Sequence, residues 1–339
     1  MACEAVAFAA GGTGGHVAPA LAVAEELKRL SPGTALLLMG GARPGEKIFE
    51  FPGDVVDVAP PRLSLRSLPS SLMNLRNSVR LAGYVLRGRR AGAVVGTGGY
   101  ASLPTLLAAF LERIPVWLLE QNQVPGRVVR LLRPWARRVV GPAGCPRRGV
   151  DPWGSPARAE FFSLPKAQDA PPLRILVSGG SQGSKTLDER LPGLLSTLQG
   201  IHVTHLHRPG GAMAAYTIAH EIVPTGPGFP ARLAACHVLL GRAGGSTIAE
   251  CNAARRPQIL VPLPSAMDDH QRANALVQKE AGAAEILEES DSDEVWRGRL
   301  QAFLTQPRLT AAAEAAGKLA DQGLCERLAR EILAGAAPR

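Results

Sequence analysis

LVSGGSQG, at residues 176–183, places a short apolar run directly before a glycine-rich turn, and a helical pattern follows the turn. The same arrangement, FAAGGTGG, occurs at residues 8–15. A buried strand, a glycine turn and a helix together form the opening unit of a doubly wound parallel sheet. The repeat therefore predicts two similar α/β domains, each with its ligand edge at the carboxyl ends of its strands.

Length and patterning support this division, because 339 residues exceed one ordinary doubly wound domain. A polar, proline-rich stretch at 155–172 separates two halves in which strands alternate with helices. We expect domains at 1–157 and 158–323, with the helix at about 324–339 packing back on the first. The expected strands are 5–10, 35–39, 55–59, 93–95, 115–119, 138–140, 174–178, 202–206, 237–240, 258–261 and 284–287.

The net charge of +9 and the pI of about 9.8 favour phosphate-rich partners such as nucleic acid, anionic lipid or small anions. Five scattered cysteines without a CxxC pair are typical of reduced thiols inside a cell. The first residues lack the basic segment of a secretory signal. The charge-free stretch 91–111 is interrupted by glycines and a proline, so we expect no membrane span there.

Four glycine turns, at 11–15, 96–99, 179–183 and 241–245, suit phosphate binding, because glycine lets a backbone approach a ligand and the next helix offers N–H groups. Val17 stands where a dinucleotide fingerprint needs glycine, which disfavours a dehydrogenase. Ser184 replaces the second glycine of a P-loop, which excludes an NTPase of that type.

The segment 241–250, GRAGGSTIAE, is the most informative of these turns. Its helix N-terminus can hold a diphosphate, and Glu250 about one turn later can accept hydrogen bonds from ribose hydroxyls. The alternative is an ordinary helix that carries a surface glutamate.

Seven stretches then occur in order: GGTGGHVAPALAVA, GTGGYASLPTLLAA, LLEQNQVPGR, GSPAR, LVSGGSQGSKTLD, GRAGGSTIAE and DDHQRANA. Over nearly the whole chain they resemble the MurG family of bacterial N-acetylglucosaminyltransferases. The resemblance implies a GT-B fold, with two Rossmann-like domains facing across a cleft. It also implies inverting transfer of N-acetylglucosamine from UDP-N-acetylglucosamine to the 4-hydroxyl of the muramyl sugar of undecaprenyl-diphosphate-linked muramyl pentapeptide (lipid I to lipid II), with no cofactor and no required metal.

The resemblance also assigns binding residues. Thr13, Gly14, Gly15, Asn122 and Gln271 would face the donor sugar, and Arg158 and Ser181 would lie near the diphosphate. The ribose and phosphate segment would be Gly245, Ser246, Thr247, Ile248, Ala249 and Glu250, with Gly226 loosely aligned to the uracil position. The chain departs from the family at Leu119, where a histidine is frequent, and at His270, where a second glutamine is frequent.

Two residues are candidates for the general base that deprotonates the attacking hydroxyl. His16 is the first choice and Glu120 the second, and such a base is worth ~10²–10⁴-fold in rate. A histidine in a glycine turn can equally be a structural hydrogen-bonding group. Backbone amides and Arg158 would stabilise the leaving diphosphate.

A lipid-linked acceptor implies a peripheral enzyme at the cytoplasmic face of the plasma membrane. Residues 58–111 contain seven arginines and no carboxylate. We expect a patch of Leu72, Leu75, Arg76, Val79 and Arg80 to bind the anionic bilayer, where each basic residue contributes about 1 kcal/mol. The alternative is an amphipathic helix with a solvated basic face.

The same features allow alternative functions to be compared. A UDP-N-acetylglucosamine 2-epimerase, or another GT-B UDP-sugar transferase, would share the architecture. Nucleic acid is not an expected partner, because the arginines lack interleaved stacking aromatics. His202, His205 and His207 resemble a metal cluster, but only the last two share a strand face and no acidic partner is adjacent in sequence, so no metal is expected.

Overall fold

The computed structural model describes residues 4–12, 14–40, 50–58, 68–145, 148–167, 171–208, 210–226 and 228–337. The chain forms two compact units. Unit 1 comprises Met1–Arg158 and Gly323–Arg339, and unit 2 comprises Ala159–Gln322. These bounds differ by one residue from the expected ones, and the roles expected of the two domains stay predictions.

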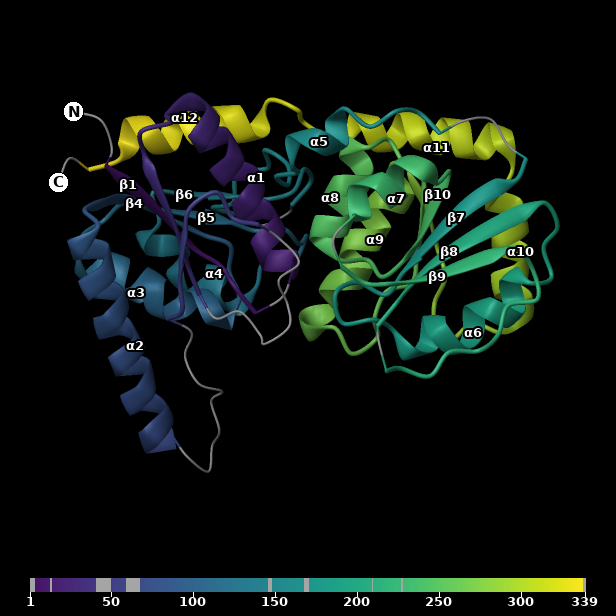
Figure 1. The fold of residues 1–339 in the computed structure, drawn as a ribbon, viewed down its shortest axis with the longest axis horizontal. Helices are drawn as coiled ribbons and strands as arrows, with labels where there is room; N and C mark the ends of the chain where they lie inside the picture. The colour runs from purple at the N-terminus through teal and green to yellow at the C-terminus, as the bar shows by residue number, and fades with distance from the viewer. Residues whose placement is uncertain are drawn as a thin grey trace. The chain divides into compact units, whose positions relative to one another are not determined.

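Unit 1 contains a six-stranded parallel sheet in the order β3-β2-β1-β4-β5-β6 (Figure 1). This order reverses direction between β1 and β4, which makes their carboxyl ends the switch point of the sheet. The strands are β1 Ala5–Ala9, β2 Ala35–Met39, β3 Asp54–Val56, β4 Ala91–Gly96, β5 Val116–Leu119 and β6 Arg138–Val140.

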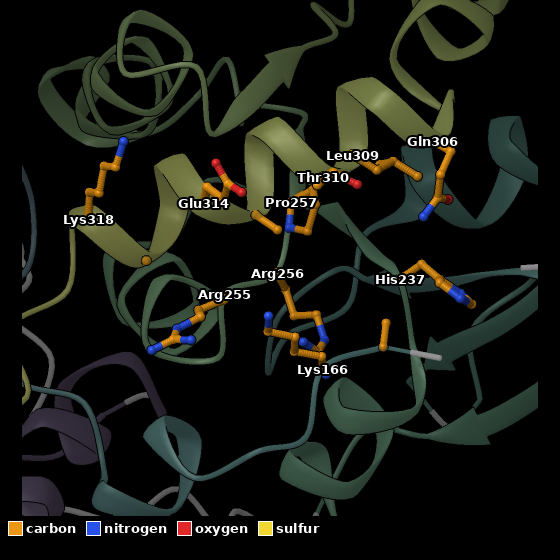
Figure 2. A pocket seen from close by; sticks show the side chains of 13 residues that line it. Lys166, His237, Arg255, Arg256, Pro257, Gln306, Leu309, Thr310, Glu314 and Lys318 are labelled. Atoms are coloured by element: carbon orange, nitrogen blue, oxygen red, sulfur yellow. The ribbon is translucent and has the colours of Figure 1, made fainter. Parts of the chain in front are cut away.

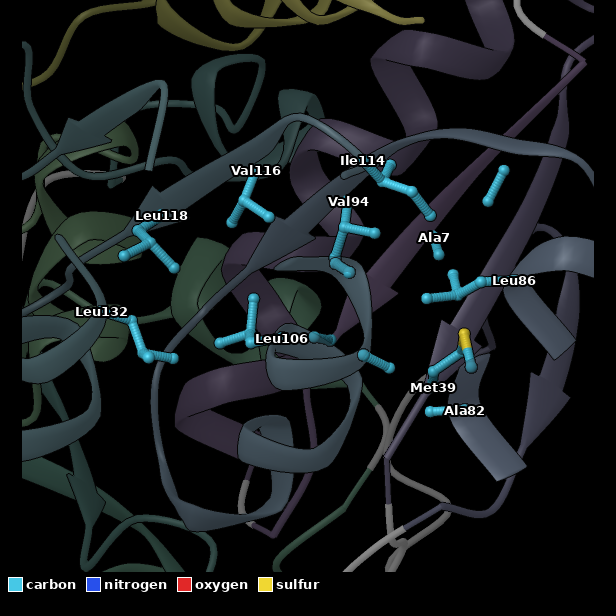
Figure 3. Close-up of a cluster of buried hydrophobic side chains, with 14 of the residues drawn as sticks. Ala7, Met39, Ala82, Leu86, Val94, Leu106, Ile114, Val116, Leu118 and Leu132 are labelled. Carbon is cyan, nitrogen blue, oxygen red and sulfur yellow. The ribbon is translucent and has the colours of Figure 1, made fainter. Parts of the chain in front are cut away.

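Alternate residues of each strand point to opposite faces of this sheet. Both faces are buried, each in its own apolar cluster. Ala7 lies in one apolar cluster, with Met39, Leu86 and Leu106 (Figure 3). Phe8 lies in the other cluster. The helices of the unit are α1 Gly14–Leu30, α2 Leu68–Gly88, α3 Leu103–Leu111, α4 Arg127–Leu132 and α12 Leu324–Gly335, with short 3₁₀ turns at η2 Tyr100–Ser102 and η3 Arg133–Trp135.

The terminal helix α12 belongs to unit 1, as expected from the sequence. Leu324, Leu328 and Ile332 are buried in the cluster that contains Phe8. Glu331 Oε1 accepts hydrogen bonds from Trp117 Nε1 at 2.9 Å and from Arg138 Nε at 2.8 Å. The helix is thus fixed to the sheet by apolar packing and by polar contacts together.

Unit 2 repeats the same winding, with a parallel sheet in the order β12-β11-β10-β7-β8-β9. Its switch point lies between β7 and β10. The strands are β7 Leu173–Ser178, β8 Ile201–His207, β9 His220–Pro224, β10 Val238–Gly241, β11 Gln258–Leu260 and β12 Ala284–Ile286. The helices are α5 Ala159–Phe162, α6 Lys185–Leu195, α7 Phe229–Ala235, α8 Gly245–Ala253, α9 His270–Glu280, α10 Asp293–Phe303 and α11 Gln306–Lys318, and η4 covers Met267–Asp269.

The prediction of two doubly wound α/β domains is therefore confirmed. The strand β9 was not predicted, because it is mostly solvent-exposed at the sheet edge and lacks a continuous apolar run. Within the described ranges, no helix combines the length and the apolar character that a bilayer span requires.

Candidate functional site

In unit 1, His16 lies at the switch point of the sheet. It sits in the first turn of α1, and its Nδ1 lies 3.0 Å from the carbonyl oxygen of Thr97, which directly follows β4. A carbonyl only accepts, so Nδ1 must carry the proton and, in the neutral ring, Nε2 keeps the lone pair. The hydrogen bond therefore fixes the tautomer in which Nε2 can act as a base.

Gly99 makes room for this imidazole. Its backbone, at φ 76° and ψ 159°, lies in a region that is essentially restricted to glycine. A Cβ added there would come within 2.9 Å of His16 Nε2. The glycine turn after β4 thus allows close approach to a side chain, a role that glycine spacing alone did not reveal.

Glu120, the second candidate base, is almost completely buried, with 3% of its surface exposed. Its Oε1 accepts hydrogen bonds from the backbone N–H groups of Gln121 and Asn122, both at 2.9 Å, and from Asn122 Nδ2 at 3.0 Å. Its Oε2 accepts one from Gly126 N at 2.7 Å. Both carboxylate oxygens thus hold the loop after β5, and this geometry favours a structural role over that of a base.

The other expected residues of unit 1 lie as follows. Gly14 and Gly15 begin α1, where the first N–H groups of a helix have no intrahelical acceptor. Asn122 lies at the same carboxyl edge, bonded to Glu120. Arg158 is half-buried and is the last residue of the first segment of the unit. Thr13 lies outside the described residues, and the binding roles of all four others stay predictions.

In unit 2, two glycine turns meet at the switch point. Gly241 is in register with Ser178, and Arg242 N donates to Ser178 O at 3.2 Å. A Cβ at Gly179 would lie 2.4 Å from Ser184 N, so the turn that contains Ser181 is too tight for a side chain there. The Ser181 turn and the N-terminus of α8 therefore lie on adjacent strands at one edge of the sheet.

The first turn of α8 begins after Gly244, which has no side chain to cap it, so backbone amides form this end of the helix. Among the residues predicted here, Gly245 and Thr247 begin the helix, while Ile248 and Ala249 are buried. Ile248 packs in an apolar cluster, so only its main chain can face a ligand.

Ser246 and Glu250 have 8% and 7% of their surfaces exposed. The expected contact of Glu250 with a ribose stays a prediction.

Gln271 is near this edge, where its Oε1 accepts a hydrogen bond from Leu263 N at 3.0 Å. Asn274, from the same helix, donates through Nδ2 to Ala243 O at 3.1 Å and so ties α9 to the α8 turn. Gly226 follows β9 at the same end of the sheet, and a Cβ there would meet nothing within 4 Å. Its position is thus open enough for larger residues, and its contact with uracil stays a prediction.

Arg242 was not singled out by sequence analysis, although it lies inside the GRAGGSTIAE motif. Only 9% of its surface is exposed. Its Nη1 donates to Val261 O at 3.2 Å, and its Nη2 lies 2.5 Å from Glu289 Oε1. It therefore braces the turn between β10 and α8 against the segments after β11 and β12.

The histidines of β8 have an acidic partner that the sequence analysis did not find. Asp188 Oδ1 lies 2.9 Å from His205 Nε2, and its Oδ2 lies 3.2 Å from His207 Nδ1. The Tyr216 hydroxyl is 2.8 Å from His205 Nδ1. Burial lowers the pKa of His205, which favours its neutral form. Asp188 comes from α6, so folding brings together residues that sequence adjacency does not.

His202 lies on the same strand but is not part of the network that Asp188, His205, His207 and Tyr216 form. Within the described ranges, no group of three or more histidines, cysteines, aspartates or glutamates could hold a metal ion.

The expected membrane patch lies on α2, and its residues differ in exposure. Leu72 is 54% exposed, and Arg76 and Arg80 are also exposed. Leu75 and Val79 are only half-buried, and Val79 packs against the core of unit 1. Three exposed apolar residues of α2 were missed: Met73, Leu81 and Tyr84.

Comparisons with known proteins show the family of the chain. Residues 6–140 match the glycosyltransferase family 28 N-terminal domain, and residues 174–327 match the corresponding C-terminal domain. The crystal structure of Acinetobacter baumannii MurG is similar, with a TM-score of 0.78 and 27% identity over 97% of this chain and 99% of that chain.

A Xanthomonas axonopodis pv. citri protein, named UDP-N-acetylglucosamine--N-acetylmuramyl-(pentapeptide) pyrophosphoryl-undecaprenol N-acetylglucosamine transferase, is 37% identical over 349 residues. The match covers 97% of this chain and 81% of that protein. The chain belongs to the MurG family of glycosyltransferases. The GT-B fold class expected from the sequence is thereby confirmed, since both units have the Rossmann-like winding of the MurG structure.

A structure described as a putative UDP-N-acetylglucosamine 2-epimerase from Listeria monocytogenes has a TM-score of 0.69, with 14% identity over 98% of this chain and 96% of that chain. This likeness extends to the fold alone.

Proposed function

We propose that this MurG-family chain transfers N-acetylglucosamine from UDP-N-acetylglucosamine to the 4-hydroxyl of the muramyl sugar of lipid I. The product is lipid II, the lipid-linked precursor of peptidoglycan. The observation that carries the proposal is the arrangement of His16, whose tautomer is fixed by Thr97 O at 3.0 Å so that Nε2 keeps its lone pair.

Unit 2 binds the donor in this proposal. The N-terminus of α8 and the turn that contains Ser181 are adjacent at the switch point, where backbone amides and the helix dipole favour a diphosphate. Glu250 then accepts hydrogen bonds from the ribose, Gln271 reaches the sugar and Gly226 borders the uracil. Arg158 adds a positive charge for the diphosphate.

Unit 1 supplies the base. His16 Nε2 takes the proton of the acceptor hydroxyl while its oxygen bonds to the anomeric carbon from the face opposite the leaving group. The bond from that carbon to the UDP oxygen breaks, and UDP leaves with the electron pair, which inverts the configuration. Fixed amides stabilise the charge that develops on the diphosphate, so the proposal requires no metal.

The acceptor brings the enzyme to the membrane. We place the contact on α2, where Leu72, Met73 and Tyr84 expose apolar surface on the helix that carries Arg76 and Arg80. Apolar anchors with flanking arginines suit an anionic bilayer. The enzyme is then peripheral and acts at the cytoplasmic face, in cell-wall synthesis and hence in cell shape and division.

The transfer is tested with labelled UDP-N-acetylglucosamine and a lipid I analogue. We expect His16→Ala to lower kcat by ~10²–10⁴-fold, because it removes a positioned base, while calorimetry shows unchanged UDP affinity. Glu250→Ala should instead weaken UDP binding. Formation of UDP-N-acetylmannosamine from the donor alone would favour an epimerase and contradict the proposal, as would a folded protein without affinity for UDP.

The membrane contact is tested by flotation with vesicles that contain anionic lipid. Arg76→Glu with Arg80→Glu should reduce the bound fraction, since each reversal removes about 1 kcal/mol of attraction and adds repulsion. The reversal of Arg330, an exposed arginine on α12, serves as the control. Equal losses in the two proteins would remove α2 from the proposal.

A further inference from the structure

Unit 2 contains a cavity of about 570 Å³, and Figure 2 shows the side chains that line it. It is lined by His237, which directly precedes β10, and by Pro257, which directly precedes β11. This cavity therefore lies at the amino ends of the strands. The Ser181 turn and the α8 turn lie at the carboxyl ends of the strands of the same sheet. Its volume is within the usual range for small-molecule sites.

The charged residues around the cavity are mostly cationic. They are Lys166, Arg255, Arg256 and Lys318, against the single carboxylate of Glu314. In the part of the chain that the structure describes, Lys166, Arg255 and Lys318 take part in none of the ion pairs. A concave surface with this excess of positive charge attracts anions.

Arg256 builds the cavity wall without being a donor to a ligand. It is 2% exposed, and its Nε and Nη1 donate to Leu233 O and Ala254 O, both at 2.9 Å. Its Nη2 donates to Pro165 O at 2.5 Å and to Ala234 O at 3.1 Å. The guanidinium thus joins the ends of α7 and α8 to the segment that carries Lys166. Burial lowers the pKa of Arg256.

Arg255 is held in place beside it. Its φ of 52° is in the left-handed region, which residues other than glycine rarely adopt. Its side chain runs along α11 at Gly317, where an added Cβ would lie 3.1 Å from Arg255 Cγ. Both the backbone turn and the glycine of α11 therefore position this guanidinium at the cavity, while the side chain itself remains exposed.

We propose that this cavity is a second ligand site, which binds a small molecule carrying a diphosphate or a longer phosphate chain. Arg255, Lys318 and Lys166 hold the phosphates, because arginine forks and lysine ammonium groups are the usual partners of phosphate oxygens. Pro257, Leu309 and Ala313 form the apolar part of the lining and accommodate the rest of the molecule. The phosphate chain comes either from a free solute or from a lipid headgroup.

The test uses inorganic tripolyphosphate and the full chain with saturating UDP, so that the donor site is filled. Lys318→Glu is compared with Lys279→Glu, because each lysine is in the last turn of its helix, α11 and α9, and only the first lines the cavity. We expect Lys318→Glu and Arg255→Gln to weaken tripolyphosphate binding at least tenfold in calorimetry. Lys279→Glu should change it less than twofold, and UDP affinity should be unchanged in all three.

Tripolyphosphate binding that disappears when UDP is saturating would overturn the proposal, as would equal effects of Lys318→Glu and Lys279→Glu. Loss of UDP binding alone would contradict the proposed transferase and leave this cavity site standing. Flotation with vesicles that contain diacylglycerol diphosphate, a lipid with a diphosphate headgroup, then assigns the source: a loss specific to Lys318→Glu supports a lipid headgroup, and unchanged flotation supports a free phosphate compound.

Discussion

Gly99→Ala tests whether the position of His16 matters for catalysis, because it alters the imidazole without removing it. The added Cβ would lie 2.9 Å from Nε2, whereas ordinary contacts begin at 3.4 Å. The ring must therefore move by about 0.5 Å or rotate, which strains the hydrogen bond to Thr97 O. A second cost arises from the backbone, since φ of 76° with ψ of 159° is nearly closed to alanine.

The two effects have different magnitudes and readouts. The backbone term is about 1–3 kcal/mol of folding stability, or roughly 2–12 °C in Tm for a unit of this size. Displacement of a catalytic group by about 1 Å costs on the order of 10²-fold in rate. We therefore expect Gly99→Ala to lower kcat by roughly 10–100-fold with UDP affinity unchanged.

Gly98→Ala is the matched control. Gly98 has a similar φ of 73°, but its added Cβ would approach Val129 Cγ2 at 3.1 Å rather than the imidazole. Both variants should lose stability, measured by thermal unfolding, and only Gly99→Ala should lose transfer beyond the fraction unfolded. If the two variants transferred sugar at the same rate, the position of the His16 ring would not limit the reaction, and the reasoning would be refuted.

Three further predictions concern stability. Glu120→Gln should cost about 1–3 kcal/mol through lost loop hydrogen bonds and keep most of the transfer rate, whereas a 100-fold loss of kcat at unchanged Tm would make Glu120 a base. Because burial lowers the pKa of His205, the folded state takes up its proton less readily than the unfolded chain. The contribution of His205 to the free energy of unfolding is therefore complete above about pH 6.5 and falls as the pH is lowered, by at most ~1.4 kcal/mol per pH unit. His205→Gln should reduce this pH dependence, as measured by urea unfolding. Leu328, on α12, is buried in the core, and Leu328→Ala should lower the free energy of unfolding in urea by about 2–5 kcal/mol. Leu333 is only half-buried, so Leu333→Ala should cost distinctly less, and equal costs would contradict the packing of α12.

Much of the fold was predictable because the strands are short apolar runs that end in glycine turns. Arg138–Val140 and Ala35–Met39 were predicted with the bounds observed, and α12 with its return to the first unit was anticipated. The strand His220–Pro224 was not, since an exposed edge strand has no continuous apolar run.

In the candidate site, glycine spacing and family resemblance predicted the turns that carry His16 and the N-terminus of α8, and the roles of these residues stay predictions. The contacts of Glu120 could not be predicted, because they depend on amides that its own loop turns toward it. Asp188 comes from α6, and its contact with His205 on β8 joins residues 17 positions apart in the sequence. The cavity around Arg256 is lined by residues from segments that are far apart in the sequence. Hydrophobic periodicity describes single helices and strands, so it could not predict that these segments come together.

The return of α12 to unit 1 has a consequence for biosynthesis. The ribosome completes residues 159–322 before it delivers the helix that unit 1 needs, so the continuous unit 2 can fold first even though unit 1 begins earlier. Until α12 emerges, the sheet face around Phe8 and Trp117 lacks that cover. A nascent chain arrested near residue 322 therefore exposes apolar surface that α12 covers in the complete fold.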